Sequence, residues 1–202
     1  MQQALYPHAD TRADAGMFQT ESPERVRKGD WILTASGVEF WPLDARAIDV
    51  VVWDIAHALS NMCRFTGHCR EFYSVAQHSL LVASIVPSED RKWALLHDAS
   101  EAYLTDLPRP LKRYSAMGEE YKRIESRLME VICERFELPL ACPESVKHAD
   151  NVLLATEKRD LMPTGDKPWE HLPAPLETLI RPMSPFVARK KFMQALAVEG
   201  VQ

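Results

Sequence analysis

Two histidines and two aspartates are the residues of this sequence whose types and spacing best suit metal chemistry. His78 stands in the segment SVAQHS, His97 and Asp98 are neighbours in WALLHDASEAYL, and Asp150 lies in KHADNVLL. Imidazole nitrogens and carboxylate oxygens together suit a divalent cation of borderline hardness. We therefore predict that these four side chains bind one divalent metal ion, with Mn, Co, Zn, Fe or Mg as candidates.

Two of these ligands have an ordinary structural alternative. His78 lies at the edge of an apolar stripe and can be a hydrogen-bonded core histidine, and Asp150 can form a buried salt bridge. The neighbours His97 and Asp98 favour the metal site. Consecutive helical residues point about 100° apart, so the two side chains share one sector of an apolar helix, and Glu101 projects about 40° from His97. Burying such groups is costly unless each is paired or bound to a cation.

Amphipathic helices are the elements that must position these residues. Asp54 can cap the first of them, and Ser88 is a natural cap for the third. Pro108 and Pro110 stop the third helix and force an extended turn. We expect helices over residues 54–64, 71–86, 90–104, 118–136 and 144–161, and a short helix around 192–196.

Strand patterns occur only near the N-terminus, where residues 31–34 and 38–41 are expected to pair as a β-hairpin with Gly37 in the turn. The prediction is an all-α fold, a helical bundle of six or seven helices with this small hairpin. It forms one domain with three parts: an unpatterned arm (1–28) and the hairpin within residues 1–47, a helical core over 48–162, and a Pro-rich wrapping segment with a short C-terminal helix over 163–202.

The composition is that of an ordinary globular protein, with 46% hydrophobic and 26% charged residues in 202 and a net charge of −5. That charge disfavours duplex nucleic acid as a partner, because duplex binding depends on neutralising phosphates. No secretory signal or membrane span is recognisable. The four cysteines form no CxxC motif, so we expect free thiols and a cytoplasmic protein. The alternative for Cys63 and Cys69 is a metal site that includes His68.

The context of the four ligands resembles the HD-domain metal-dependent phosphohydrolases, whose signature is H…HD…D on a helical bundle. The stretches CRFTGHCREFYSVAQHS, LLHDASEAYLTDLPRPLK and KHADNVLLATEKRDL look like the 5′-deoxynucleotidase branch and its phage and prophage relatives. The resemblance spans residues 48–162. It implies an enzyme that hydrolyses nucleoside 5′-monophosphates, preferably deoxyribonucleotides, to nucleoside and phosphate.

The resemblance also assigns roles around the metal. It implies that Arg64 reaches the phosphate and that Glu101 and Asp106 handle protons and the attacking water. It places Phe65 near the sugar, where the best-known members have Trp. The chemistry agrees, because phosphate ester hydrolysis needs an activated water, positive charge on the phosphate and a proton for the leaving alkoxide. Two further candidates for substrate contact are His68 and Lys112, whose alternatives are a loop residue and an exposed lysine.

Two other functions are compatible with these residues. Within the same superfamily, a dNTP triphosphohydrolase or a signalling-nucleotide hydrolase would use the cations of residues 105–123. A protein of another class would hold a structural or sensory metal without catalysis, although Glu101 and Asp106 would then have no use. We also expect a homodimer, because residues 118–136 and 162–185 offer apolar surface beyond what one bundle needs and relatives of this type dimerise.

Overall fold

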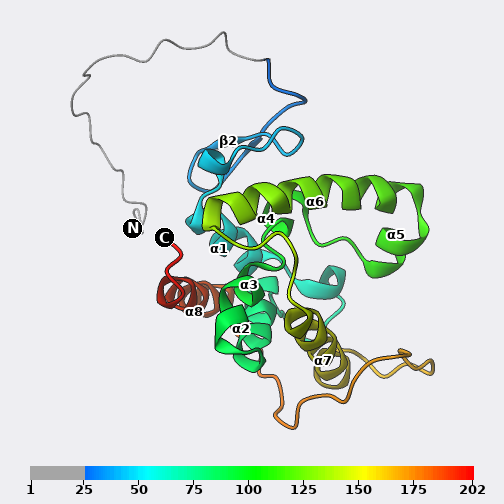
Figure 1. Cartoon of the computed structure of the whole chain (residues 1–202). Coiled ribbons are helices and arrows are strands. Elements are labelled where there is room, and N and C mark those ends of the chain that lie inside the picture. Colours follow the sequence, from blue (N-terminus) through cyan, green and yellow to red (C-terminus); the bar gives the residue numbers. More distant parts are fainter. Residues whose placement is uncertain (1–25) are drawn as a thin grey trace, which may run out of the picture.

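The computed structural model describes residues 26–202, and the predicted arm lies outside that range up to residue 25. The first elements are the antiparallel strands β1 (Ile32–Leu33) and β2 (Glu39–Phe40). The helices that follow are α1 (Val52–Asn61), α2 (Val75–Ile85), α3 (Arg91–Leu96), α4 (Glu101–Leu104), α5 (Arg109–Tyr114), α6 (Ala116–Phe136), α7 (Glu144–Leu161) and α8 (Pro185–Val198) (Figure 1). The predicted all-α class and the small hairpin are confirmed.

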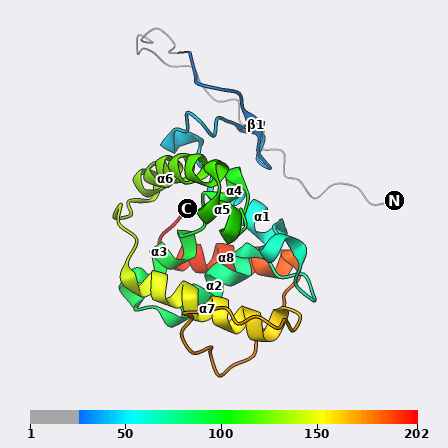
Figure 2. The same cartoon turned by 90° about the vertical axis from the view of Figure 1, so that its right-hand side faces the viewer.

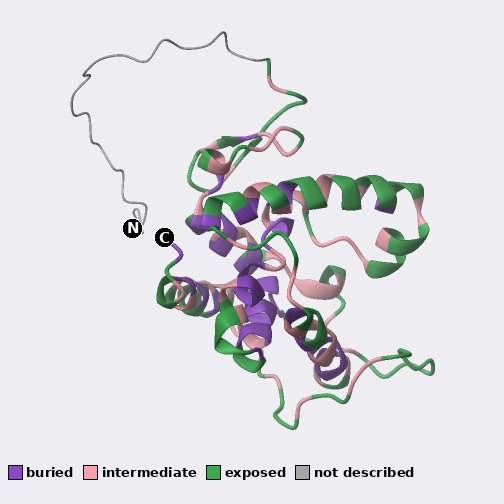
Figure 3. Ribbon diagram, viewed as in Figure 1, coloured by how far each residue is buried: buried purple, intermediate pink, exposed green. Residues whose placement is uncertain are grey.

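Helix α2 lies at the centre of the bundle and contacts α1, α3, α7 and α8 (Figure 2). Ser74 caps it, since its side-chain oxygen accepts a hydrogen bond from the Gln77 amide at 3.1 Å. The buried residues gather where these helices meet (Figure 3). One apolar core joins them through side chains such as Leu59, Val82, Leu95, Leu153 and Phe192.

Several predicted helix boundaries are wrong, among them the end of the first helix, which lies at Asn61 rather than at Arg64. Residues 71–74 precede α2 outside the helix, because the Arg64 amide donates to the Tyr73 carbonyl and Cys63 pairs with Ser74. Helix α1 starts two residues before Asp54, so Asp54 does not cap it. Ser88 begins a separate 3₁₀ turn, Ser88–Asp90, and caps no α-helix.

The predicted helix over 90–104 is interrupted between α3 and α4. The Ala99 amide bonds the Leu96 carbonyl and the Glu101 amide bonds the Asp98 carbonyl, each three residues back rather than four. Such bonds tighten the turn and change the direction of the side chains that it carries. The interruption therefore lies at His97 and Asp98, two of the predicted metal ligands.

The hairpin contacts the helices through its turn and through β2. The Ser36 amide and hydroxyl both donate to the Asp54 carboxylate of α1, at 2.7 and 2.6 Å. The fully buried Phe40 stacks on Tyr103 of α4, with ring centroids 3.9 Å apart. Because Tyr103 stands two residues after Glu101, the hairpin supports the short helix that carries this candidate acid.

The Pro-rich segment contains no helix up to residue 184, as predicted, and side chains of α2 and α7 fix its second half. We call residues 176–183 the strap; it runs from the α7 side toward α8 (Figure 1). Amides of the strap donate to Thr156, Asp160 and Gln77, and the Gln77 side chain also donates to the Arg181 carbonyl at 2.8 Å. Helix α8 is longer than predicted and starts with a Ser184 cap.

Helix α5 was not predicted. Its Pro110 lies in the first turn, where a missing amide proton is tolerated, so the proline continues the chain into a helix instead of forcing an extended turn. The helix packs closely on α6 at Gly118, where an added Cβ would meet the carbonyl oxygens of Leu111 and, at 2.5 Å, Lys112.

A methyl group at Gly118 is expected to destabilise the protein. The atoms it would meet are backbone, which cannot rotate away, so Gly118→Ala should lower the free energy of unfolding by about 1–3 kcal/mol. Urea unfolding measures this change. Gly165→Ala is the control, since nothing lies within 4 Å of its Cβ. Equal stability of the two variants would contradict the close packing of α5 on α6.

Candidate metal centre

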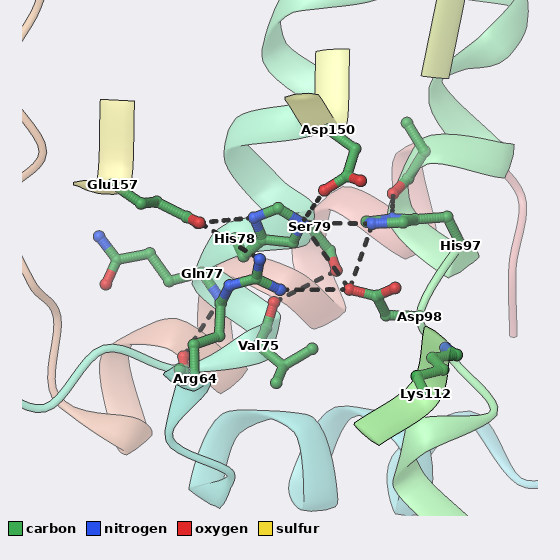
Figure 4. Close-up of polar contacts among 12 residues, drawn as sticks. Arg64, Val75, Gln77, His78, Ser79, His97, Asp98, Lys112, Asp150 and Glu157 are labelled. Atoms are coloured by element: carbon green, nitrogen blue, oxygen red, sulfur yellow. Dashed lines mark hydrogen bonds and ion pairs between the residues drawn. The ribbon is translucent and has the colours of Figure 1, made fainter. Parts of the chain in front are cut away.

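Three of the four predicted metal ligands, His78, His97 and Asp98, form one group, and Asp150 lies beside His78. His78 comes from α2 and is fully buried, His97 and Asp98 come from the turn after α3, and Asp150 comes from α7 (Figure 4). The Nε2 atom of His78 lies 3.3 Å from Nε2 of His97, 3.7 Å from Oδ2 of Asp98 and 3.2 Å from Oδ1 of Asp150. Ligand atoms of His78, His97 and Asp98 all lie within 4.8 Å of one another and could hold a metal ion.

The second nitrogen of each imidazole is held by a hydrogen-bond acceptor. His78 Nδ1 lies 2.7 Å from Oε1 of Glu157, and His97 Nδ1 lies 2.7 Å from the carbonyl oxygen of Ala94. Both Nδ1 atoms therefore donate, which leaves Nε2 of each ring as the atom that can bind a metal. Metal-binding histidines are commonly oriented in this way.

The charges of the centre favour a cation. Burial and the Arg64 guanidinium oppose protonation of His78, but Glu157 and Asp150 outweigh them and raise its pKa to about 9. Burial opposes ionisation of Asp150, yet the bond from His78 lowers the Asp150 pKa to about 2. Burial acts likewise on Asp98, and the charges of His97, His78 and Arg64 still hold its pKa far below the usual range. Without a metal, a proton on His78 balances these carboxylates.

Arg64, predicted to reach the phosphate, lies between two carboxylates of the centre. Its Nη1 is 3.6 Å from Oδ2 of Asp98 and its Nη2 is 3.2 Å from Oε2 of Glu157, while Nε is buried without a hydrogen-bond partner. It stands outside α1, in a 3₁₀ turn over Arg64–Gly67 where Phe65 and Thr66 have positive φ angles. The guanidinium thus joins the turn after α3 to α7 electrostatically.

Glu157 is the residue that sequence reasoning missed. It is fully buried, and burial is outweighed by Arg64 and His78, which lower its pKa. It follows Asp150 by seven residues, two helical turns, and therefore lies on the same face of α7. That spacing was a signal in the sequence, but the neighbouring charges Lys158 and Arg159 made the segment resemble a solvated face.

The two candidate acids lie next to these groups. Glu101 is 6% exposed, and its Oε2 atom has no hydrogen-bond partner. Burial, reinforced by the charges of Asp98 and Asp106, raises the Glu101 pKa well above its usual value. Burial also raises the pKa of Asp106, against the opposing charge of Arg64. Both carboxyl groups therefore retain protons more readily than ordinary carboxyl groups do.

The remaining candidates lie around the centre. Lys112 donates to Glu125 at 2.6 Å, and Phe65 packs against Trp169. His68 is exposed, and its side chain makes no hydrogen bond or ion pair with residues 26–202. All four cysteines are free, as expected. Within the described range, Cys63, Cys69 and His68 do not form a group close enough to share a metal ion.

Two known proteins have sequences similar to this chain along much of its length, and no family model matches the chain. The uncharacterized protein YfdR of Escherichia coli (strain K12) is 43% identical over 167 residues, which cover 81% of this chain and 92% of YfdR. This chain belongs to the YfdR family. An uncharacterized protein of Rhodobacter capsulatus is 37% identical over 131 residues, 60% of this chain and 66% of that protein. In this YfdR-family member, the helices of residues 26–202 are all too short or too polar to cross a membrane.

Proposed function

We propose that this protein is a metal-dependent phosphohydrolase of the HD type that hydrolyses nucleoside 5′-monophosphates, with deoxyribonucleotides preferred. The observation that carries the proposal is the pair of imidazole Nε2 atoms of His78 and His97. They face each other at 3.3 Å while both Nδ1 atoms are held by acceptors. The carboxylates of Asp98 and Asp150 lie beside them, so the donor set and its charge suit a divalent cation.

Each part of the site has a task in phosphate ester hydrolysis. The two histidines and two aspartates would hold a divalent ion, which would supply an activated water and neutralise charge on the phosphate. Arg64 directs Nη1 and Nη2 toward Asp98 and Glu157, and its guanidinium supplies positive charge beside the ligands for a phosphate oxygen. Charge-assisted bonds of this kind are strong in a buried site.

Glu101 is the proton donor in this proposal. Its raised pKa favours the protonated form of the carboxyl group, and its Oε2 has no partner among residues 26–202, so Glu101 is the candidate donor to the leaving 5′ oxygen of the nucleoside. Asp106 is the second proton carrier, and its pKa is raised for the same main reason, burial. A site that only stored a metal would have no need for two such acids.

The distribution of cations favours a monophosphate over a triphosphate. Of the basic residues between 105 and 123, Lys112 is half-buried and held by Glu125. Arg123 pairs with the exposed Glu120 of its own helix. The others, Arg109, Arg113 and Lys122, are exposed. A triphosphate would require several inward-facing cations, and this segment provides one.

Removal of the metal tests the proposal directly. We expect phosphate release from nucleoside 5′-monophosphates to stop with EDTA and to return with Mn²⁺ or Co²⁺. His97→Ala and Asp98→Ala should both contain well below one equivalent of metal, because each removes a ligand from the centre. The control is His148→Ala, an exposed histidine on α7.

Two outcomes would contradict this assignment in different ways. A full equivalent of metal in both the His97 and the Asp98 variants would show that the ion binds elsewhere. Stoichiometric metal in the unmodified protein without phosphate release from mono-, di- or triphosphates would favour a non-catalytic metal-holding module.

A further inference from the structure

Two aromatic side chains form a wall beside the metal centre, and we call Phe65 and Trp169 the aromatic wall. The Phe65 ring lies 5.4 Å from Cζ of Arg64, and the Trp169 ring lies 5.9 Å from the Phe65 ring. Nζ of Lys158 lies 5.4 Å from the Trp169 ring, and Lys158 directly follows Glu157 on α7. The wall therefore begins at the residue after Arg64, and the lysine beside its far end is the residue after the buried Glu157.

The backbone turns Phe65 toward this position at a conformational cost. Phe65 and Thr66 have φ angles of 55° and 56°, a region that residues other than glycine rarely adopt. Such strain persists only where the surrounding structure fixes it, and it gathers at sites that bind ligands. Here Arg64, which is bound to two carboxylates, precedes the turn, and the ring of Trp169 from the Pro-rich segment lies next to Phe65.

Trp169 is a partly exposed indole. It is 38% exposed, stands in a segment with no helix or strand, and has the Phe65 ring and the Lys158 ammonium near its ring. An aromatic surface flanked by cations suits a flat ligand that also carries negative charge, because the ring stacks while the cations attract the anion.

We propose that Trp169, together with Phe65, stacks on the base of a nucleotide whose phosphate lies at Arg64. This inference rests on the proposed function and deepens it, since it makes a planar base part of what the site recognises. A phosphate ester without a ring would reach Arg64 and the metal ligands but would leave the aromatic wall uncovered. The Pro-rich segment then contributes to recognition as well as to packing.

Trp169→Leu is the test variant, because it removes the stacking surface and keeps an apolar side chain. One stacked base contributes a factor of about 5–150 in binding, so KM for nucleoside 5′-monophosphates should rise by about that factor. We expect kcat and the inhibition constant of inorganic phosphate to stay unchanged, because neither depends on the base. Trp53→Leu is the matched control, since Trp53 is 40% exposed and packs under Arg189 of α8.

Tryptophan fluorescence gives a second readout that does not require turnover. A nucleoside 5′-monophosphate should quench the emission of the unmodified protein and of Trp53→Leu, and quench that of Trp169→Leu much less. Equal quenching in the two variants, or an unchanged KM for Trp169→Leu, would overturn the stacking proposal and leave the hydrolysis intact. Quenching that depends on Trp169 in a protein that releases no phosphate would support the stacking and reject the proposed activity.

Discussion

Glu101→Gln is expected to lower kcat for nucleoside monophosphate hydrolysis by about 10²–10⁴-fold, the usual contribution of general acid–base catalysis. Glutamine has the shape of the protonated glutamic acid but has no carboxyl proton to give to the leaving oxygen. Glu101 is buried, and burial raises its pKa, so the neutral glutamine resembles the form that the site favours. Metal content and KM should therefore stay close to those of the unmodified protein.

Steady-state kinetics and metal analysis on the same samples decide this prediction. Glu119→Gln is the control, since Glu119 is exposed on α6 and its loss should leave kcat unchanged. A near-normal kcat for the Glu101 variant would remove Glu101 from the mechanism and make Asp106 the proton carrier. Loss of metal from that variant would instead identify Glu101 as a fifth ligand.

Arg64→Leu is expected to reduce the free energy of unfolding by about 3–5 kcal/mol, the cost of removing one partner of a buried ion pair. The substitution removes one of the two partners of the fully buried Glu157, which keeps only His78, and takes one counter-charge from Asp98. From sequence resemblance alone, Arg64 was a phosphate ligand, and its loss should have affected substrate capture only. The geometry adds a structural cost to that expectation.

Urea unfolding of the metal-free protein measures this cost without interference from the cation. Arg70→Leu is the matched control, because Arg70 is an exposed arginine in the same loop. Its change should remain within about 0.5 kcal/mol. If both variants unfold at the same urea concentration as the unmodified protein, Arg64 is not an electrostatic support of the centre.

Local patterns in the sequence were sufficient to predict most of the helices. Helix α7 has the predicted bounds, and α6 starts two residues earlier than predicted. Apolar periodicity determines such long elements because each buries one continuous stripe against its neighbours. The interruption at His97 was not predictable in this way, since the segment WALLHDASEAYL has a helical pattern throughout and only the contacts of the folded chain select the tighter turn.

Residue type and order along the chain were sufficient to propose the histidine and aspartate ligands. His78 and Asp150 were both predicted on inward faces, and their side chains approach to 3.2 Å, with His78 fully buried and Asp150 partly exposed. Glu157 and Trp169 were missed for different physical reasons. The role of Glu157 depends on Arg64, 93 residues away, and local periodicity does not encode such a partner. Trp169 stands in a segment without apolar periodicity, so the direction of its side chain could not be predicted from the sequence.

Hydrogen bonds from the strap make the exchange of its amides sensitive to the positions of α2 and α7. The amides of Leu176, Ile180 and Met183 lie outside regular secondary structure, yet each donates to a side chain of α7 or α2. Hydrogen exchange at these three amides requires local opening, so it should be slow for a loop. It should accelerate only when the helices that carry His78 and Asp150 separate from the strap. Three loop amides would thus report, in solution and without a substrate, how rigidly the two helices are held.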